Sequence, residues 1–193
     1  MLHITMGSHH PAGAPGSDPR LGEVDIYRLP DTDLRDVRGL ITCAGADQIF
    51  LERNRELLTG FVRAGGRVAV MGHPVTDFLP GLGVWRELDY TGPKDLQISL
   101  GDPHPVWAGI DPVDLSARKG VTGFYSRGYV DKLPPDAVIT TRIGRHALPL
   151  DYVYPLGAGQ VLVHSGNDLI NWEGDANTAA RMTPQLIDWL VAR

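Results

Sequence analysis

Four histidines follow short apolar runs of this sequence, at the points where buried strands would end: His9, His10, His73 and His164. Imidazole titrates near neutral pH, so it can transfer a proton or bind a metal ion. We take His164 as the candidate general acid or base, and His73 as a second candidate catalytic residue that orients a substrate or a metal. His9 and His10 are adjacent, so extended backbone turns them to opposite sides and one of them faces a ligand. The structural alternatives are exposed loop histidines or an imidazole bonded to a nearby carbonyl.

Further candidate ligand-binding residues lie close to these histidines or in similar loops: Gly45, Ala46, Asp47, Asn167, Asp168, Arg127 and Trp172. The backbone amides of Gly45 and Ala46 would bind developing negative charge. Asp47 also fits the N-cap of the helix that follows it, and we favour this second interpretation. Asn167 and Asp168 offer polar groups to a ligand, although the same residue types commonly stabilise turns.

Arg127 lies among aromatic residues in the stretch 123–130, and Trp172 follows Asp168 closely. Aromatic faces beside an arginine suit a sugar ring or an anionic group. A strand with packed aromatic side chains explains the same pattern. Histidines together with Asp168 would form a mixed nitrogen and oxygen set for a divalent metal ion. No pair has a close ligand spacing, so the metal signal is weak and no cofactor is predicted.

The stretch Gly-Ser-His-His at 7–10 also resembles the start of an expression tag, which would have to be excluded from any argument about the fold. A tag normally continues as a longer histidine run, and this one stops at two. Residues 11–23 are interrupted by Pro and Gly, which excludes a regular helix there. We therefore interpret the stretch as native sequence that enters a long loop, and loops of this length are often functional.

Length and composition indicate one globular domain, 1–193, with a sizeable core. Hydrophobic residues make up 42% and charged residues 21%, which is ordinary for such a domain. A net charge of −5 gives no reason to expect nucleic acid or an anionic membrane as a partner. No apolar run approaches the roughly 20 residues of a membrane span. The single cysteine, Cys43, and the absence of a signal-like N-terminus lead us to expect a cytoplasmic protein.

Apolar runs at 2–6, 24–29, 39–43 and 67–72 predict buried strands. Between the third and the fourth, apolar residues recur at helical spacing until Gly65 and Gly66, which predicts an amphipathic helix. A strand, a helix and a second strand imply a parallel sheet with both faces covered.

Turn residues become frequent after His73. Further strands are predicted at 96–100, 137–143, 150–154 and 160–164, and a final helix within about 175–192. We predict a three-layer α/β fold with an irregular, strand-rich insertion. Ligands of open α/β sheets bind beyond the carboxyl ends of the strands, so the loops that follow the strands should converge on one site. We therefore expect His73 and His164 on the same edge of one parallel sheet.

Four motifs occur in a characteristic order: FVRAGGRVAVMGHP at 61–74, HPVWAGI at 104–110, GAGQVLVHSGNDLINW at 157–172 and LIDWLVAR at 186–193. In this order they resemble the trehalose-utilisation (ThuA-like) family of the class I glutamine amidotransferase-like superfamily. The resemblance implies a flavodoxin-like fold. It matches the family's loop and strand positions to Gly7, His9, His10, Gly65, Gly66, His73, Gly157, Gly159, Val161, His164 and Asp168.

The sequence departs from the amidotransferases that hydrolyse glutamine, which use a cysteine at a strand-to-helix elbow, a histidine, and a glutamate two residues beyond it. His164 matches the histidine, but position 166 is glycine. The elbow MGHPV at 71–75 has no cysteine or serine, so no acyl-enzyme can form there. Cys43 follows a different strand, where we expect a small buried side chain. We therefore expect no glutaminase activity.

Two functions follow from these patterns. The first is a domain that binds or processes a small polar metabolite, carbohydrate-like in character, at the carboxyl edge of the sheet. The alternative is a catalytically inactive relative that acts as a protein-interaction module or forms a homodimer. Convergent histidines in a cleft would favour the first, and a filled cleft beside a large apolar surface would favour the second.

Overall fold

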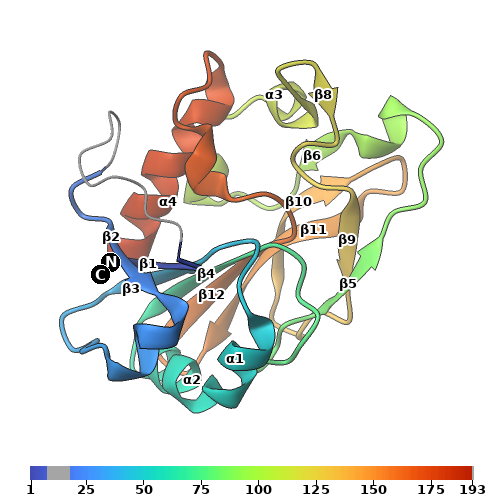
Figure 1. Ribbon diagram of the computed structural model, residues 1–193. Coiled ribbons are helices and arrows are strands. Elements are labelled where there is room, and N and C mark those ends of the chain that lie inside the picture. The colour runs from blue at the N-terminus through green and yellow to red at the C-terminus, as the bar shows by residue number, and fades with distance from the viewer. Residues whose placement is uncertain (8–17, 193) are drawn as a thin grey trace.

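A central sheet of eight strands runs through the protein, whose computed structural model describes residues 1–7 and 18–192 (Figure 1). Five strands in succession across the sheet are parallel: β2 (Gly22–Asp25), β1 (Leu2–Thr5), β3 (Gly39–Thr42), β4 (Arg67–Met71) and β12 (Gly159–His164). The remaining strands each run antiparallel to their neighbours: β11 (Leu148–Leu156), β10 (Val138–Ile143) and β6 (Ile98–Leu100). The fold is mixed α/β with a large, mostly parallel central sheet.

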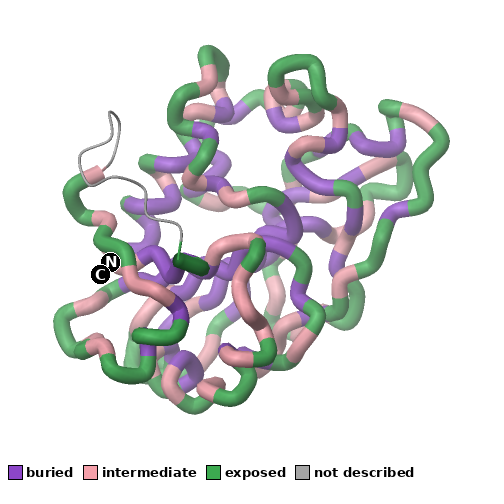
Figure 2. The backbone as a smooth tube through the Cα atoms, viewed as in Figure 1, coloured by how far each residue is buried: buried purple, intermediate pink, exposed green. Residues whose placement is uncertain are grey.

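Helices cover both faces of the sheet (Figure 1). On one face α1 (Gln48–Arg53) and α2 (Arg55–Arg63) pack on alternate strand residues such as Leu40, Val68 and Val161. On the other face α4 (Met182–Val191) packs on Ile41, Ala69 and Leu162. Because side chains alternate along a strand, neighbouring residues of each strand build the two cores. Figure 2 shows the buried residues concentrated along the central strands and α4.

The predicted element at 24–29 was wrong in its second half. β2 ends at Asp25, and a 3₁₀ helix, η1 (Ile26–Asp31), follows it. The Asp25 carboxylate accepts a hydrogen bond from the Tyr27 amide at 2.9 Å and so starts that helix. The single helix expected before β4 is two helices, which meet at Asn54. The strands predicted at 2–6, 39–43, 67–72 and 160–164 are confirmed to within a residue.

The segment between β4 and β10 is irregular, as expected. It forms a small sheet of β5 (Val84–Glu87) and β9 (Gly128–Asp131) and a second one of β7 (Ala117–Arg118) and β8 (Val121–Thr122). Its short helices are η2 (Pro93–Leu96), η3 (Pro105–Trp107) and α3 (Pro112–Ser116). The final helix is preceded by η4 (Leu169–Trp172) and η5 (Thr178–Arg181). None of the helices in the described residues is long and apolar enough to cross a membrane.

Candidate functional site

The strands β3, β4 and β12 end at one edge of the sheet, which we call the carboxyl edge. His164 at the end of β12 is paired in register with Met71 at the end of β4, two residues before His73. The prediction that His73 and His164 lie on the same edge is confirmed. β1 ends at Thr5 on the same edge. His9 and His10, which follow it in the sequence, lie outside the described residues.

His164 is fully buried, and both of its ring nitrogens have partners. Nδ1 lies 2.8 Å from Asp151 Oδ1, and Nε2 lies 2.8 Å from the Asn167 carbonyl oxygen. Both partners carry acceptor oxygens, so both ring nitrogens are engaged by the protein. Neither nitrogen is available to a ligand in this arrangement. The geometry favours a positioning role, in which His164 holds the loop at Asn167, and the catalytic role stays a prediction.

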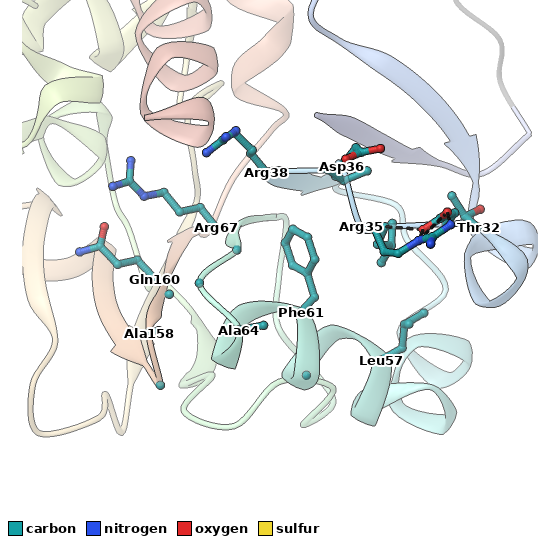
Figure 3. A pocket seen from close by; sticks show the side chains of 18 of the residues that line it. Thr32, Arg35, Asp36, Arg38, Leu57, Phe61, Ala64, Arg67, Ala158 and Gln160 are labelled. Atoms are coloured by element: carbon teal, nitrogen blue, oxygen red, sulfur yellow. Dashed lines mark hydrogen bonds and ion pairs between the residues drawn. The ribbon is translucent and has the colours of Figure 1, made fainter. Parts of the chain in front are cut away.

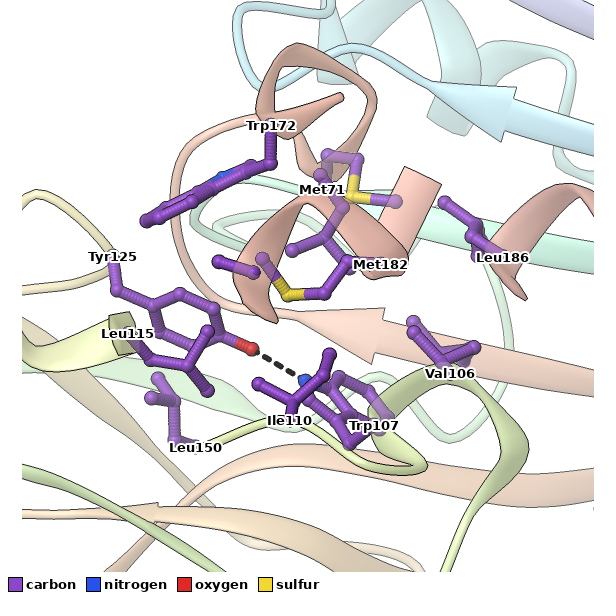
Figure 4. Close-up of a cluster of buried hydrophobic side chains, with 14 of the residues drawn as sticks. Met71, Val106, Trp107, Ile110, Leu115, Tyr125, Leu150, Trp172, Met182 and Leu186 are labelled. Atoms are coloured by element: carbon purple, nitrogen blue, oxygen red, sulfur yellow. Dashed lines mark hydrogen bonds between the residues drawn. The ribbon is translucent and has the colours of Figure 1, made fainter. Parts of the chain in front are cut away.

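Asp151 is the centre of a buried hydrogen-bond network beneath the carboxyl edge. Its Oδ2 accepts hydrogen bonds from the hydroxyls of Tyr125 and Thr141, both at 2.5 Å. The Tyr125 hydroxyl accepts in turn from Trp107 Nε1 at 2.9 Å, as Figure 4 shows. A break in the pairing register of β10 around Thr141 accompanies this arrangement. Burial, with the Asp151 carboxylate beside it, raises the pKa of Tyr125 well above its ordinary value.

Two loops of the carboxyl edge are tied together above this network. Asn167 Nδ2 donates to the Phe124 carbonyl at 2.6 Å, and Ser126 Oγ donates to the Ser165 carbonyl at 2.5 Å. Asn167 itself remains exposed. The loop 123–128 therefore lies against the loop that follows β12, although the bonded residues are 39 and 43 positions apart in the sequence. The carboxyl edge is built jointly by the parallel strands and the insertion.

His73 is exposed and lies flat on Trp85 of β5, with ring centroids 4.0 Å apart and an interplanar angle of 13°. Partial burial, with the positive charge of His164 as a second cause, lowers the pKa of His73. Its backbone is fixed by Gln48, whose Nε2 donates to the His73 carbonyl at 2.7 Å. The Gln48 Oε1 atom also accepts from the Val75 amide at 2.8 Å. The imidazole is thus held in one orientation with its edge available.

The loop after β3 turns its polar groups inward. The Ala46 amide donates to the Cys43 carbonyl at 3.1 Å. The Ala46 amide is therefore not free to bind a developing negative charge in this arrangement, and that role of Gly45 and Ala46 stays a prediction. Burial, followed by the Asp168 carboxylate, raises the pKa of Cys43. The thiolate needed for nucleophilic attack is therefore disfavoured.

Asp47 and Asp168 both have structural partners. Asp47 Oδ1 accepts from the Phe50 amide at 2.9 Å, which confirms the predicted N-cap of α1, and Oδ2 accepts from the Tyr27 hydroxyl at 3.2 Å. Asp168 Oδ1 accepts from the Ala44 amide at 2.6 Å and so ties the loop after β12 to the loop after β3. Each carboxylate keeps oxygen lone pairs for further donors.

Trp172 and Arg127 differ in their exposure to solvent. Trp172 is fully buried in the core, beneath the guanidinium carbon of Arg118 at 4.6 Å and beside the ring of Phe124 at 5.7 Å. A ligand could reach Trp172 only after the surrounding core rearranged. The alternative interpretation, an aromatic side chain packed in the core, therefore describes this residue. Arg127 is exposed, and no ion pair of its side chain is found within residues 1–7 and 18–192.

No group of three His, Cys, Asp or Glu side chains suited to a metal ion occurs in the described part of the chain. A hollow of about 1190 Å³ lies elsewhere, at the opposite edge of the sheet. A smaller hollow of about 440 Å³ is lined by Leu100, His104, Trp107 and Thr140 among others. The polar residues of the carboxyl edge do not line either one.

Three residues that shape the carboxyl edge were missed in the sequence: Asp151, Trp85 and Gln48. Asp151 had a visible signal, because it is the one charged residue in the apolar run LPLDYVYPL at 148–156. A lone carboxylate in a buried strand requires a buried partner. Trp85 and Gln48 had no such signal, since their roles depend on how the insertion folds back over the sheet.

Comparisons with known proteins find similarity in structure but not in sequence. No family model matches the sequence, and no curated protein matches it. The fold is similar to the cytoplasmic protein STM3548 from Salmonella typhimurium, with a TM-score of 0.61 and 13% identity over 92% of this chain and 83% of that one. It is also similar to the cytoplasmic protein STM1381 from Salmonella typhimurium LT2, with a TM-score of 0.53 and 12% identity over 88% and 77%. A cold-adapted β-galactosidase from Rahnella sp. R3 matches with a TM-score of 0.51 and 16% identity, over 88% of this chain but 24% of the enzyme. At these identities the likeness describes the fold.

Proposed function

We propose that the carboxyl edge binds a small polar metabolite of carbohydrate-like character. The observation that supports this most directly is the exposed His73 ring stacked on Trp85, beside loops that present Arg127, Asn167 and Asp168. An oriented imidazole can donate or accept a hydrogen bond from a hydroxyl group. The exposed Arg127 guanidinium and the Asn167 amide add donors, and a polyhydroxylated ligand is bound by polar groups of this kind.

The proposal includes the finer features that the resemblance implies. These are a flavodoxin-like topology, membership of the ThuA-like family and a cytoplasmic location. The two Salmonella proteins are described as cytoplasmic, and the Rahnella protein acts on a galactoside. Likeness of fold does not transfer a substrate, so the carbohydrate character is argued from the stacked ring and the polar loops.

Absence of glutaminase activity is part of the same proposal. Gly72, with φ of +87°, and His73 form the turn after β4, and no hydroxyl or thiol lies at that turn. A Cβ atom at Gly72 would lie 2.5 Å from the Ala44 carbonyl oxygen, so the turn cannot accommodate a larger residue. The one thiol, Cys43, lies on the neighbouring loop with its pKa raised.

A separate observation favours the alternative, a module that binds another protein or a second copy. Four exposed apolar side chains surround the start of α1: Met6, Tyr27, Ile49 and Val75. Hydrogen bonds connect their neighbourhood, because Asp47 bonds to Tyr27 and to Met6 Sδ, and Gln48 bonds to the Val75 amide. Apolar residues grouped in this way are typical of contact surfaces.

The test is a titration of the isotopically labelled protein with neutral mono- and disaccharides, in which the backbone amide chemical shifts are recorded by NMR. We expect saturable shifts in the loops 72–76, 124–128 and 165–168. His73→Ala and Arg127→Ala should each weaken binding about tenfold, which corresponds to about 1.4 kcal/mol. The matched control is His146→Ala, a change at an exposed histidine in the turn between β10 and β11, which should bind as the wild type does.

Shifts confined to other surfaces, or equal affinity in all three variants, would contradict the metabolite site. Sedimentation velocity over a range of concentrations tests the alternative. A dimer that dissociates in Ile49→Glu, together with no response to saccharides, would replace the first proposal by the second.

A further inference from the structure

The edge opposite the carboxyl edge, which we call the amino edge, contains the hollow of about 1190 Å³. Its walls come from the segment 32–38 before β3, the end of α2 and the turn 157–160 between β11 and β12. Figure 3 shows these elements around the hollow, with Phe61 at its centre. None of the candidate residues of the carboxyl edge lines it, so it is a separate place on the molecule.

Three arginines line this hollow, and they differ in their partners. Arg35 forms an ion pair and three side-chain hydrogen bonds with Asp33. Arg38 and Arg67 have no carboxylate within 4 Å in the described residues. Arg35 is therefore paired locally, while Arg38 and Arg67 form no ion pair within the described part of the chain, although Asp36 and Glu56 also line the hollow.

Arg67 is partly buried, which makes its uncompensated charge significant. Its guanidinium lies 5.3 Å from the ring centroid of Trp189, and Nη1 donates to the Trp189 carbonyl at the end of α4. Burial lowers the pKa of Arg67. A guanidinium has five N–H donors, and one of them is used by the protein here. The others remain for an acceptor outside the chain.

Arg38, Arg67 and Gln160 are brought together by the start of three neighbouring strands. The Arg67 amide donates to the Arg38 carbonyl at 3.1 Å, and Gln160 is paired in register with Arg67. Figure 3 shows both guanidinium groups pointing to the same side, toward α4, and Asp36 pointing away from them. Within residues 1–7 and 18–192, neither the Arg38 guanidinium nor the Gln160 side-chain amide has a hydrogen-bond partner.

From this geometry we infer a second ligand site, which binds the oxyanion of a small organic phosphate or carboxylate between Arg38, Arg67 and Gln160. Arg38 and Arg67 start from backbone segments that are hydrogen-bonded to each other, and an oxyanion bound by both guanidinium groups would offset the repulsion between their charges. Each can donate two parallel N–H groups to one anion, and the Gln160 amide adds a neutral donor. The apolar residues Leu57 and Phe61 of α2 line the same hollow from the other face of the sheet, so the organic part of the ligand would reach them around the sheet edge.

The test uses isothermal titration of the intact chain with phenyl phosphate, benzoate and inorganic phosphate at constant ionic strength set with chloride. The first two probes distinguish a phosphate from a carboxylate, and inorganic phosphate measures the contribution of the oxyanion alone. We expect saturable binding of phenyl phosphate or benzoate, with inorganic phosphate weaker than phenyl phosphate. Arg38→Ala should weaken the tighter probe at least tenfold.

Arg35→Ala is the matched control, since Arg35 lines the same hollow but is paired with Asp33. It should change the affinity less than twofold. Arg67→Lys keeps the charge but removes the planar fork, so it should weaken binding about fivefold or more without unfolding the chain. The inference is overturned if none of the probes saturates, or if Arg35→Ala and Arg38→Ala weaken binding equally, because general surface charge would then explain the effect.

Discussion

The two edges of the central sheet differ in how their polar groups are compensated. At the carboxyl edge, Asp151, His164 and Asp168 satisfy one another or nearby backbone, and the arrangement is dense. At the amino edge, Arg38 and Arg67 lie beside a hollow of about 1190 Å³ without a carboxylate partner in the described residues. The carboxyl edge has the residue types that can do chemistry, and the amino edge has the hollow, with two arginines that form no ion pair among these residues.

This difference shows that residue type and availability are separate properties. Histidine, aspartate and tyrosine together suggest catalysis, yet here they form a buried network whose donors and acceptors are already used. Such a network fixes the conformation of the loops above it, since each member would lose a partner if the loops moved. Arg38 and Arg67 stand in ordinary sequence surroundings that do not indicate a site, although both lack an ion pair in the described residues and can bind a ligand.

The largest effect is expected from Asp151→Ala, which removes the centre of the carboxyl-edge network. The variant leaves the fully buried His164 without its carboxylate partner. Breaking a buried ion pair in this way costs about 3–5 kcal/mol. We expect the free energy of unfolding, measured by urea denaturation, to fall by that amount.

Asp33→Ala provides the comparison at the amino edge, because it removes a carboxylate from the exposed ion pair with Arg35. Its unfolding midpoint should stay close to that of the wild type, since exposed ion pairs contribute little. If Asp151→Ala proves too unstable to study, Tyr125→Phe removes one of the hydrogen bonds to Asp151 and should cost about 1–2 kcal/mol. Equal stability of Asp151→Ala and Asp33→Ala would contradict the contrast between the edges.

A smaller effect on stability is expected from protonation of His104 at low pH. Charged residues of both regions act on this imidazole. Burial, with the Arg67 charge as the second cause and Asp151 acting in the opposite direction, lowers the pKa of His104 to about 4. The unfolded chain takes up a proton at this imidazole near pH 6.5 and the folded chain near pH 4. The neutral imidazole is therefore fully compatible with the fold above pH 6.5, and stability is lost as the pH falls from 6.5 toward 4.

We expect this loss to amount to about 2 kcal/mol, a value reduced from the full shift because the ring is partly exposed. Urea unfolding at pH 7 and pH 4.5 measures it. His104→Asn keeps a side-chain acceptor for the Val106 amide and removes the titration. The variant should lose less stability than the wild type between the two pH values, and an identical loss would show that the imidazole does not sense its burial.

The sequence was informative where a local pattern determines the structure. Apolar runs located the strands of the parallel half, and the strand-end rule placed His73 and His164 on one edge. The sequence did not show which side chains remain available to a ligand. The partner that engages His164 is Asp151, thirteen residues away on an antiparallel neighbouring strand. The stacking of His73 on Trp85 likewise depends on an insertion whose irregular turns no periodic pattern describes.

The amino-edge hollow could not be predicted for a related reason. Arg38, Arg67 and Gln160 occupy unremarkable positions just before or at the start of strands. Their proximity comes from the order β3-β4-β12, in which the last strand of the chain's parallel half lies beside β4. Strand order across a sheet is a long-range property, and hydrophobic periodicity does not contain it.

A modest effect is expected from Asp168→Ala at the carboxyl edge. The change removes the acceptor of the Ala44 amide and so unties the loop after β12 from the loop after β3. Loss of one such hydrogen bond costs about 1 kcal/mol, which a urea denaturation series resolves. Hydrogen exchange at the Ala44 amide should become faster while exchange in β4 stays the same. Unchanged protection at Ala44 would show that this contact does not hold the loop.

The smallest effect is expected from Cys43→Ala on glutamine hydrolysis, and it sharpens the distinction between residue type and availability. The turn after β4 has no nucleophile, and the thiol on the neighbouring loop has its pKa raised by burial and by the Asp168 carboxylate. Attack on an amide requires the thiolate, so neither loop can form an acyl-enzyme. Ammonia release from glutamine should therefore equal the protein-free background in both the wild type and the variant. Release above background by the wild type that disappears in Cys43→Ala would show that Cys43 reaches a substrate, and the carboxyl edge would then be a catalytic centre despite its dense hydrogen bonding.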